Sequence, residues 1–392
     1  MRSTKIWLQE VIKSSNKKII LKLIYKEKEL TKQDIAKSLG LSIPTVINNI
    51  NELLKEGLVE EAGVAGSTGG RKPVIVRFKP SSRYTIGVEV LKDRVIAILF
   101  DLNCQMVLER EEKLKSKKEN EAILETIIKV INKLIEDSKI NKDIILGIGF
   151  SLPGTVNEEK LILEEAPNLK LKIVNFHQLE ELFKLPLYIE NEANSAAFAE
   201  LTLGLGKESR NLVYISITEG LGTGIVIDGH LYKGKNKRAG EFGHTVIKAG
   251  GRLCSCGKKG CFEAYASSVA LIESYNSLSS NKLTKLEDYF IALDAGDKEA
   301  KITWNAYMNY LATGIDNIIM GLDPHYIVIG GDITKHQEEL LQGIKDRIFK
   351  ENSFYKKEDI KIFSTRLGVY ASIMGAALLP LQKLFNLRDN TI

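Results

Sequence analysis

Glu241-Phe242-Gly243-His244 and Cys254-Ser255-Cys256-Gly257-Lys258-Lys259-Gly260-Cys261-Phe262-Glu263 are the stretches that decide the fold of this 392-residue chain. Three of its four cysteines fall within eight residues, and a histidine precedes them by ten positions. One imidazole and three thiolates are the ligand set of a closed, tetrahedral zinc site. The sequence therefore predicts one structural zinc ion, with the ligands His244, Cys254, Cys256 and Cys261.

The spacing of these ligands indicates whether the metal shapes a loop or belongs to a DNA-reading zinc finger. A zinc finger carries two histidines on one helix and this segment does not, so we expect the zinc to shape the loop 244–261 and not to read DNA. The alternative is that the three cysteines lie near one another, and near a histidine of the core, by chance and hold no metal. Neither a signal peptide nor an apolar run of membrane-spanning length is present, which predicts a cytoplasmic protein with reduced thiols and no membrane association.

Upstream of the metal segment, Glu190-Asn191-Glu192-Ala193-Asn194 lies between a predicted strand (187–189) and a predicted helix (195–203). Carboxylate and amide side chains at such a junction have no core to fill, and they suit hydrogen bonding to vicinal hydroxyl groups. The alternative is that Asn191 or Asn194 merely caps the helix. Glycine-rich segments at 217–224 and 330–332 adjoin predicted strands and are compatible with oxyanion binding, although glycines between strands more often mark tight turns.

The apolar pattern from residue 83 onward alternates between strand and helix periods. A first series has strands at 84–90, 94–101, 106–108 and 144–150, with a helix at 119–137. A second series has strands at 212–217, 224–227 and 326–329, with helices at 298–321 and 368–385. Strands followed by helices, twice over, predict two similar α/β lobes with a ligand cleft between them.

The first 80 residues differ in both charge and pattern. They hold 15 Lys/Arg and 8 Asp/Glu, a balance of +7, whereas the rest of the chain has a balance of −2. Three short helical patterns follow one another, at about 17–25, from the N-cap Thr31 onward, and at about 43–56. This is the layout of a helix-turn-helix, in which the last helix enters the major groove by its N-terminal half.

The third helix of this module is expected to bury Val46, Ile50 and Leu53 and to leave its polar side chains facing outward. A basic, glycine-rich segment at 66–73 interrupts two short strands and predicts a wing. Protein–protein docking is the alternative for a three-helix module, but the charge and the basic tip favour double-stranded DNA, bound by a homodimer or a higher homo-oligomer. The residues expected to contact DNA are Ser42, Thr45, Asn48, Asn49, Arg71 and Lys72.

Together with Ser151-Leu152-Pro153-Gly154, these segments resemble the repressor branch of the ROK family over nearly the whole chain. The resemblance implies a winged helix-turn-helix domain (1–80) followed by a two-lobed α/β actin-like ATPase (ribonuclease H-like) domain (83–392) with a sugar in its cleft. It also implies that His244 binds zinc through one ring nitrogen and faces the sugar with the other. The sugar-binding residues it implies are Pro153, Gly154, Asn191, Glu192, Glu241, His244 and Glu263.

Two departures from the family's kinases favour a repressor without catalytic residues. The kinases open their first lobe with Asp-x-Gly-Gly-Thr-Lys, and the aligned stretch 89–94 lacks the glycines that let the backbone approach ATP phosphates. Glu192 stands at the position of the kinase base, an Asp, and is one methylene longer. The pattern is most similar to that of xylose repressors, which release their operator when the sugar binds. The alternatives are a ROK kinase acting on glucose, N-acetylglucosamine or a related sugar, and a zinc-stabilised DNA-binding protein controlled by a partner protein.

Overall fold

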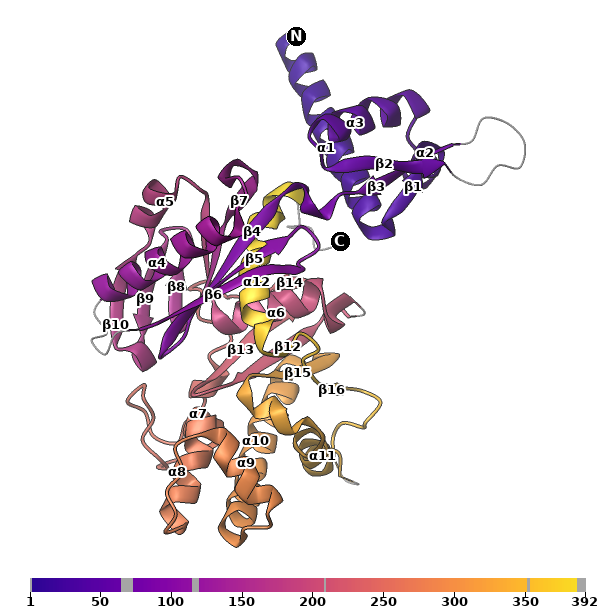
Figure 1. Cartoon of the computed structure of the whole chain (residues 1–392). Helices are drawn as coiled ribbons and strands as arrows, with labels where there is room; N and C mark the ends of the chain where they lie inside the picture. Colours follow the sequence, from indigo (N-terminus) through magenta and orange to yellow (C-terminus); the bar gives the residue numbers. More distant parts are fainter. Residues whose placement is uncertain (1, 65–72, 115–119, 208, 351–352, 386–392) are drawn as a thin grey trace.

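A helix-turn-helix domain stands at one end of the molecule, and two α/β lobes follow it (Figure 1). The structure is a computed structural model that describes residues 2–64, 73–114, 120–207, 209–350 and 353–385. Within these ranges, no helix is both long enough and apolar enough to cross a membrane.

The N-terminal domain is built as the sequence predicted, with a longer first helix. Its elements are α1 (Arg2–Glu27), β1 (Glu29–Thr31), α2 (Lys32–Leu39), α3 (Ile43–Lys55), β2 (Val59–Val64) and β3 (Val74–Phe78). Thr31 and Asp34 form a reciprocal capping box at the start of α2, and Gly40 ends that helix with a φ of +62°. The antiparallel strands β2 and β3 flank the predicted wing, whose tip, residues 65–72, lies outside the described residues.

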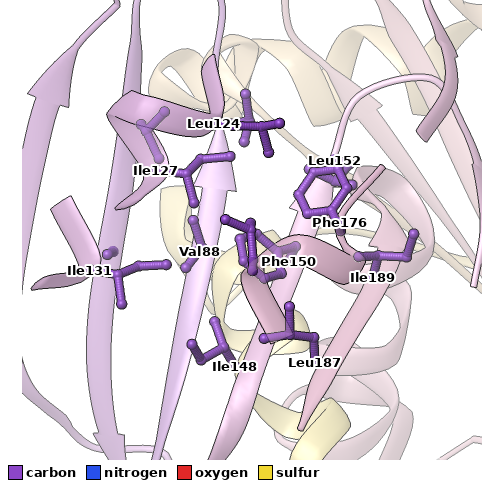
Figure 2. Close-up of a cluster of buried hydrophobic side chains, with 14 of the residues drawn as sticks. Val88, Leu124, Ile127, Ile131, Ile148, Phe150, Leu152, Phe176, Leu187 and Ile189 are labelled. Carbon is purple, nitrogen blue, oxygen red and sulfur yellow. The ribbon is translucent and has the colours of Figure 1, made fainter. Parts of the chain in front are cut away.

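Lobe 1 is a five-stranded sheet in the order β11-β7-β4-β5-β6. Its strands are β4 (Tyr84–Val90), β5 (Arg94–Asp101), β6 (Met106–Lys113), β7 (Ile145–Leu152) and β11 (Leu187–Asn191). The helix α4 (Asn120–Ser138) covers one face, because its apolar stripe packs on the strands through residues such as Ile127 and Ile131. Figure 2 shows this core, in which Phe150 and Phe176 meet edge to face.

Lobe 2 repeats the same plan in the order β14-β13-β12-β15-β16. Its strands are β12 (Leu212–Ile217), β13 (Leu221–Ile227), β14 (His230–Leu231), β15 (Tyr326–Gly330) and β16 (Lys361–Ser364). In each lobe the first three strands pair antiparallel and the last two add parallel. This shared order confirms the predicted pair of similar lobes.

Smaller elements surround the two sheets. Lobe 1 adds an antiparallel sheet of β8 (Thr155–Asn157), β9 (Ile162–Ala166) and β10 (Leu171–Asn175), followed by α5 (His177–Phe183). Lobe 2 adds the helices α7 (Glu263–Ala266), α8 (Ser268–Leu278), α9 (Leu286–Asp294), α10 (Lys298–Leu322) and α11 (Gln337–Ile348). Of these elements, the sequence predicted only α10.

The two lobes meet along α6 (Glu192–Thr202) and α12 (Ala371–Phe385). The helix α6 packs on β12 and β13 of lobe 2, whereas α12 packs on β4 and β7 of lobe 1. Gly375 permits the close crossing of the two helices, because a Cβ there would lie 1.8 Å from the carbonyl oxygen of Ser195. Any movement of one lobe relative to the other therefore has to be accommodated at this crossing.

The helix-turn-helix domain rests on lobe 1 and on α12. The Lys28 ammonium, just after α1, lies 3.4 Å from the Asn103 amide oxygen in the β5–β6 turn of lobe 1. The Arg83 guanidinium donates to the carbonyl oxygen of Glu56 at the end of α3, and α1 also contacts α12. The DNA-binding module is thus in contact with one of the two helices at which the lobes meet.

Candidate functional site

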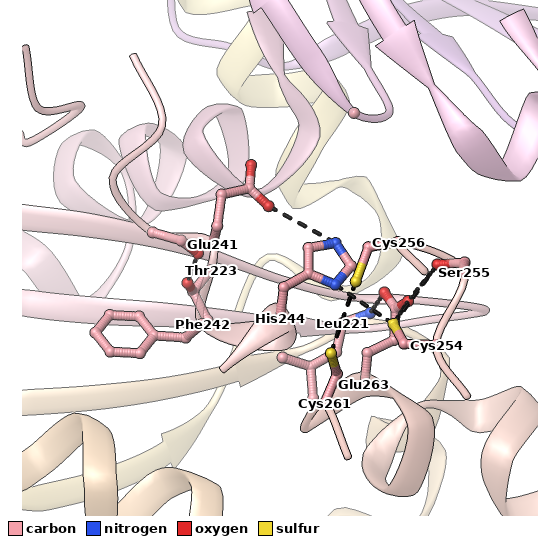
Figure 3. A network of polar contacts seen from close by, with 12 residues as sticks. Leu221, Thr223, Glu241, Phe242, His244, Cys254, Ser255, Cys256, Cys261 and Glu263 are labelled. Atoms are coloured by element: carbon pink, nitrogen blue, oxygen red, sulfur yellow. Dashed lines mark hydrogen bonds and ion pairs between the residues drawn. The ribbon is translucent and has the colours of Figure 1, made fainter. Parts of the chain in front are cut away.

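The four predicted metal ligands come together in the loop that follows β14 (Figure 3). Their ligand atoms all lie within 4.8 Å of one another, with Cys254 Sγ 3.5 Å from His244 Nδ1 and Cys256 Sγ 3.7 Å from Cys261 Sγ. Four ligands around a zinc ion, with Zn–S bonds of about 2.3 Å, place neighbouring sulfur atoms about 3.8 Å apart. The donor set and its spacing therefore fit a tetrahedral metal ion.

His244 faces two different groups with its two ring nitrogens. Nδ1 points to the thiol cluster, and Nε2 lies 4.0 Å from Glu241 Oε2. Figure 3 shows Glu241 on the opposite side of the imidazole from the cysteines. One ring nitrogen thus faces the other metal ligands and the second faces Glu241, whereas the contact of His244 with a sugar, which the family resemblance implied, stays a prediction.

Glu263 ties the metal loop to the sheet of lobe 2. Its Oε2 accepts a hydrogen bond of 3.0 Å from the backbone N–H of Leu221, the first residue of β13. Its Oε1 accepts a 3.0 Å hydrogen bond from Ser255 and lies 3.7 Å from Cys254 Sγ. The carboxylate therefore occupies a fixed position between the cysteine loop and the glycine-rich strand.

Asn191 has a structural role that the sequence left open. Its Oδ1 accepts hydrogen bonds from the backbone N–H groups of Ala193 and Asn194, which makes it the N-cap of α6. Its Nδ2 donates to the carbonyl oxygen of Gly154 at 2.8 Å. One amide hydrogen is left for a ligand, so capping does not exclude sugar binding.

The predicted sugar-binding residues divide between neighbouring cavities. Gly154, Asn191 and Glu241 line a small polar cavity of about 40 Å³ that both lobes enclose. Pro153 and Glu192 line a cleft of about 800 Å³ between the lobes. His244 and Glu263 line neither of these two cavities. A volume of 40 Å³ is far below the roughly 300–1,000 Å³ of small-molecule sites, so a sugar that contacts all seven residues has to extend beyond this cavity.

The larger cleft is acidic where the resemblance to kinases would place phosphates. Glu89 is buried and accepts a hydrogen bond from the Ser372 hydroxyl, and Glu192 accepts one of 2.6 Å from the Ser216 hydroxyl. Burial raises the pKa of Glu89 to about 7, and the charges of Glu192 and Asp332 add to that increase. Burial also raises the pKa of Glu192 and that of Asp332. Three carboxyl groups thus line this part of the cleft, and their raised pKa values favour the protonated form; Lys92, Arg94 and Lys335 line the same cleft.

The turn between β4 and β5 is a tight hairpin turn on this side of the cleft. Leu91, Lys92 and Asp93 form a hairpin turn closed by a 2.9 Å hydrogen bond from the Leu91 N–H to the Arg94 carbonyl oxygen. The side chains of this turn line the cleft. Lys92 also forms a 2.8 Å ion pair with Glu219 of lobe 2, which bridges the cleft.

One predicted DNA contact is wrong. Ser42 and Asn48 are exposed and Thr45 is partly exposed, but Asn49 is only 2% exposed and its amide donates to the Thr45 carbonyl oxygen at 2.8 Å. Asn49 follows Val46 by three residues and precedes Leu53 by four, so it lies on the buried face of α3. Two further predicted contacts, Arg71 and Lys72, lie outside the described residues.

The structure adds three charged residues to the small cavity that the sequence did not single out for a role. The ammonium of Lys233, in the loop after β14, is shared by the carboxylates of Glu158 and Glu190 in lobe 1. Lys237 forms a 2.8 Å ion pair with the outer oxygen of Glu158. A lysine in a loop is usually solvated, and only the tertiary fold places this one between two carboxylates.

Comparison with known proteins connects both parts of the chain to characterised relatives. Residues 85–383 match the ROK family, and residues 14–60 match the winged helix-turn-helix DNA-binding family. The xylose repressor of Bacillus spizizenii is 31% identical over 378 residues, which is 95% of this chain and 97% of that protein. A glucokinase of Halalkalibacterium halodurans is also 31% identical, over 320 residues, which is 77% of this chain and 96% of that protein.

A solved structure agrees with both matches. The crystal structure of a ROK family transcriptional regulator, a homolog of the Escherichia coli MLC protein, superposes with a TM-score of 0.81 at 26% identity. The superposition covers 96% of this chain and 97% of the regulator's chain. The match to the xylose repressor covers 95% of the chain and therefore has to include most of the N-terminal domain. The match to the glucokinase covers 77% and can leave that domain out.

Proposed function

The chain belongs to the ROK family, and we propose that it is a sugar-responsive transcriptional repressor that binds operator DNA through its winged helix-turn-helix domain. The observation that carries the proposal is the small polar cavity, to which lobe 1 contributes Gly154 and Asn191 and lobe 2 contributes Glu241. A ligand that binds groups on both lobes stabilises one arrangement of them over others. Because α1 contacts α12, that arrangement also influences the DNA-binding module.

We propose that the sugar is xylose and that the protein acts as a homodimer on two operator half-sites. The similarity to xylose repressors along both domains supports the first point. Helix-turn-helix repressors usually bind two half-sites about one DNA turn apart, which supports the second. The Arg71–Lys72 wing tip would add minor-groove or phosphate contacts to those of Ser42, Thr45 and Asn48.

A kinase is the second candidate function, because a glucokinase is 31% identical to this chain over 320 residues. The turn at 91–93 has side chains in place of the glycines that let the backbone approach ATP phosphates, so we propose that the chain has no catalytic residue. A thermal-shift screen against pentoses and hexoses, followed by an ATP-consumption assay with each sugar that binds, separates the two functions. The repressor predicts sugar binding without ATP consumption, and turnover at enzymatic rates would favour the kinase.

We propose that the metal held by His244 and the three cysteines is zinc, with a structural role. The ion would close the loop that carries Glu263, and it would hold His244 with Nε2 directed toward Glu241. A closed Cys₃His set leaves zinc no position for substrate.

Purified protein should contain about one zinc per chain without added metal. Cys256→Ser should lose the zinc and unfold at a lower temperature, because a structural zinc site contributes directly to folding stability. Elemental analysis and thermal unfolding measure both effects. Cys104→Ser is the control, since Cys104 lies outside the cluster and that variant should keep its zinc. Full stability of Cys256→Ser, or no zinc in the wild type, would contradict the assignment.

Adjacent asparagines of α3 should behave differently toward DNA. Asn48→Ala should relax the sequence preference of operator binding, because an exposed Asn can pair with an adenine edge, a contact worth about 1–3 kcal/mol of discrimination. Asn49→Ala should leave the sequence preference unchanged, since its side chain is buried against the domain core. Competition binding with single-base operator variants measures the difference. Equal loss of preference in both variants would reject the assigned face of α3.

A further inference from the structure

We infer that Lys233 is a specificity-determining residue that donates a hydrogen bond to one hydroxyl group of the bound sugar. This inference rests on the proposed function. It goes beyond the sugar-binding residues that the family resemblance implies, since Lys233 is not one of them.

The first step of the argument is the position of the Lys233 ammonium. It lines the same small cavity as Gly154, Asn191 and Glu241, and its side chain is only 18% exposed. The loop that carries it leads directly to Glu241, and two hydrogen bonds to backbone carbonyl oxygens of the loop hold it in place. The N–H of Ala239 donates to the carbonyl oxygen of Lys233 at 3.0 Å. The Thr223 hydroxyl donates to the carbonyl oxygen of Gly240.

The second step is the number of donors. A lysine ammonium has three N–H groups and no acceptor. The carboxylates of Glu158 and Glu190 take two of them, and no third acceptor contacts this nitrogen in the ranges of the chain that the structure describes. The cavity, which has space for about three water molecules, is the place where a third acceptor can sit. A sugar hydroxyl oxygen in this space would accept the bond.

The third step is that both charge and position are fixed. The attraction of the two carboxylates raises the pKa of Lys233 despite its burial, so the group stays a donor at neutral pH. Glu190 is itself held by the Asn194 amide at 3.1 Å and by the backbone N–H of Asn191 at 3.0 Å. A donor held this firmly between the lobes can distinguish one hydroxyl position from another, because it cannot follow a hydroxyl group that points elsewhere.

Lys233→Met should weaken D-xylose binding by about 10- to 100-fold, the range expected for one hydrogen bond to a charged donor. Lys235, an exposed lysine of the same loop that does not line the small cavity, is the matched control. Methionine at this position should leave the affinity within about twofold. Calorimetry on the full chain measures the affinities, with thermal unfolding as the folding check.

Deoxy sugars separate a direct contact from a structural role of the ion pairs. Wild type and Lys233→Met are each titrated with D-xylose and with its 2-, 3- and 4-deoxy analogues. If Lys233 donates to one hydroxyl, one analogue binds the wild type weakly, and the variant binds that analogue as well as it binds xylose. Equal weakening of all four sugars, or no weakening at all, would overturn the inference while leaving the repressor intact. A wild type that binds no pentose or hexose would instead refute the proposed function.

Discussion

Glu241→Ala should bind operator DNA as tightly as the wild type and should no longer release it when xylose is added. Glu241 lines the small cavity from lobe 2 and lies near His244, far along the chain from the DNA-binding module. Sugar-induced release of the wild type should amount to about 5- to 150-fold, or about 1 to 3 kcal/mol of coupling. The variant should lose this coupling because it loses the cross-lobe contact that makes the sugar prefer one arrangement.

Operator titrations with and without xylose, together with calorimetry of sugar binding, measure both parts of this prediction. Glu273→Ala is the matched control, because Glu273 is an exposed residue of α8 in the same lobe and lines neither cavity. It should respond to xylose as the wild type does. A Glu241→Ala protein that still releases operator at wild-type xylose concentrations would remove Glu241 from the sugar site.

Glu89→Gln should stabilise the protein above neutral pH by up to about 3 kcal/mol. Burial raises the pKa of Glu89 from its ordinary value of 4.5 to about 7, and each pKa unit corresponds to about 1.4 kcal/mol. Below about pH 4.5 the carboxyl is protonated in both the folded and the unfolded chain, and its ionisation costs nothing. As the pH rises toward 7 the unfolded chain releases the proton first, so the stability of the wild type falls.

Glutamine keeps an acceptor for the Ser372 hydroxyl and removes this titration. Denaturant unfolding at pH 5 and at pH 8 should therefore show a gain for Glu89→Gln that is small at pH 5 and large at pH 8. Glu181→Gln, on the exposed side of α5, should change stability little at either pH. A gain of the same size at both pH values would show that Glu89 is not held in a protonated state.

The main features of the fold could be predicted from sequence because local patterns specify them. The strands β4, β5 and β12 have the predicted ends, since each is a mainly apolar segment rich in β-branched and aromatic residues. The small sheet β8–β10 was missed. Its strands have three to five residues and mix polar or charged with apolar side chains, so no period is visible. Their pairing depends on contacts between strands, which no single segment encodes.

The functional site also has parts that the sequence predicts and parts that it does not. The metal ligands could be assigned from residue type and spacing, and the structure brings their ligand atoms together. Asn49 was misassigned because polarity was given more weight than its place on the Val46–Leu53 face of α3. Lys233 could not be found from sequence, because its partners Glu158 and Glu190 lie 75 and 43 residues away and only the closed lobes bring them together.

The central claim is tested most directly by the affinity of the wild-type protein for its operator, measured with and without xylose at one fixed salt concentration. A glucose control and an ATP-consumption assay accompany the titration. The account predicts that xylose weakens operator binding by about 5- to 150-fold, that glucose has a smaller effect and that no sugar is phosphorylated. An operator affinity that no pentose or hexose changes, or phosphorylation of xylose at enzymatic rates, would contradict the account.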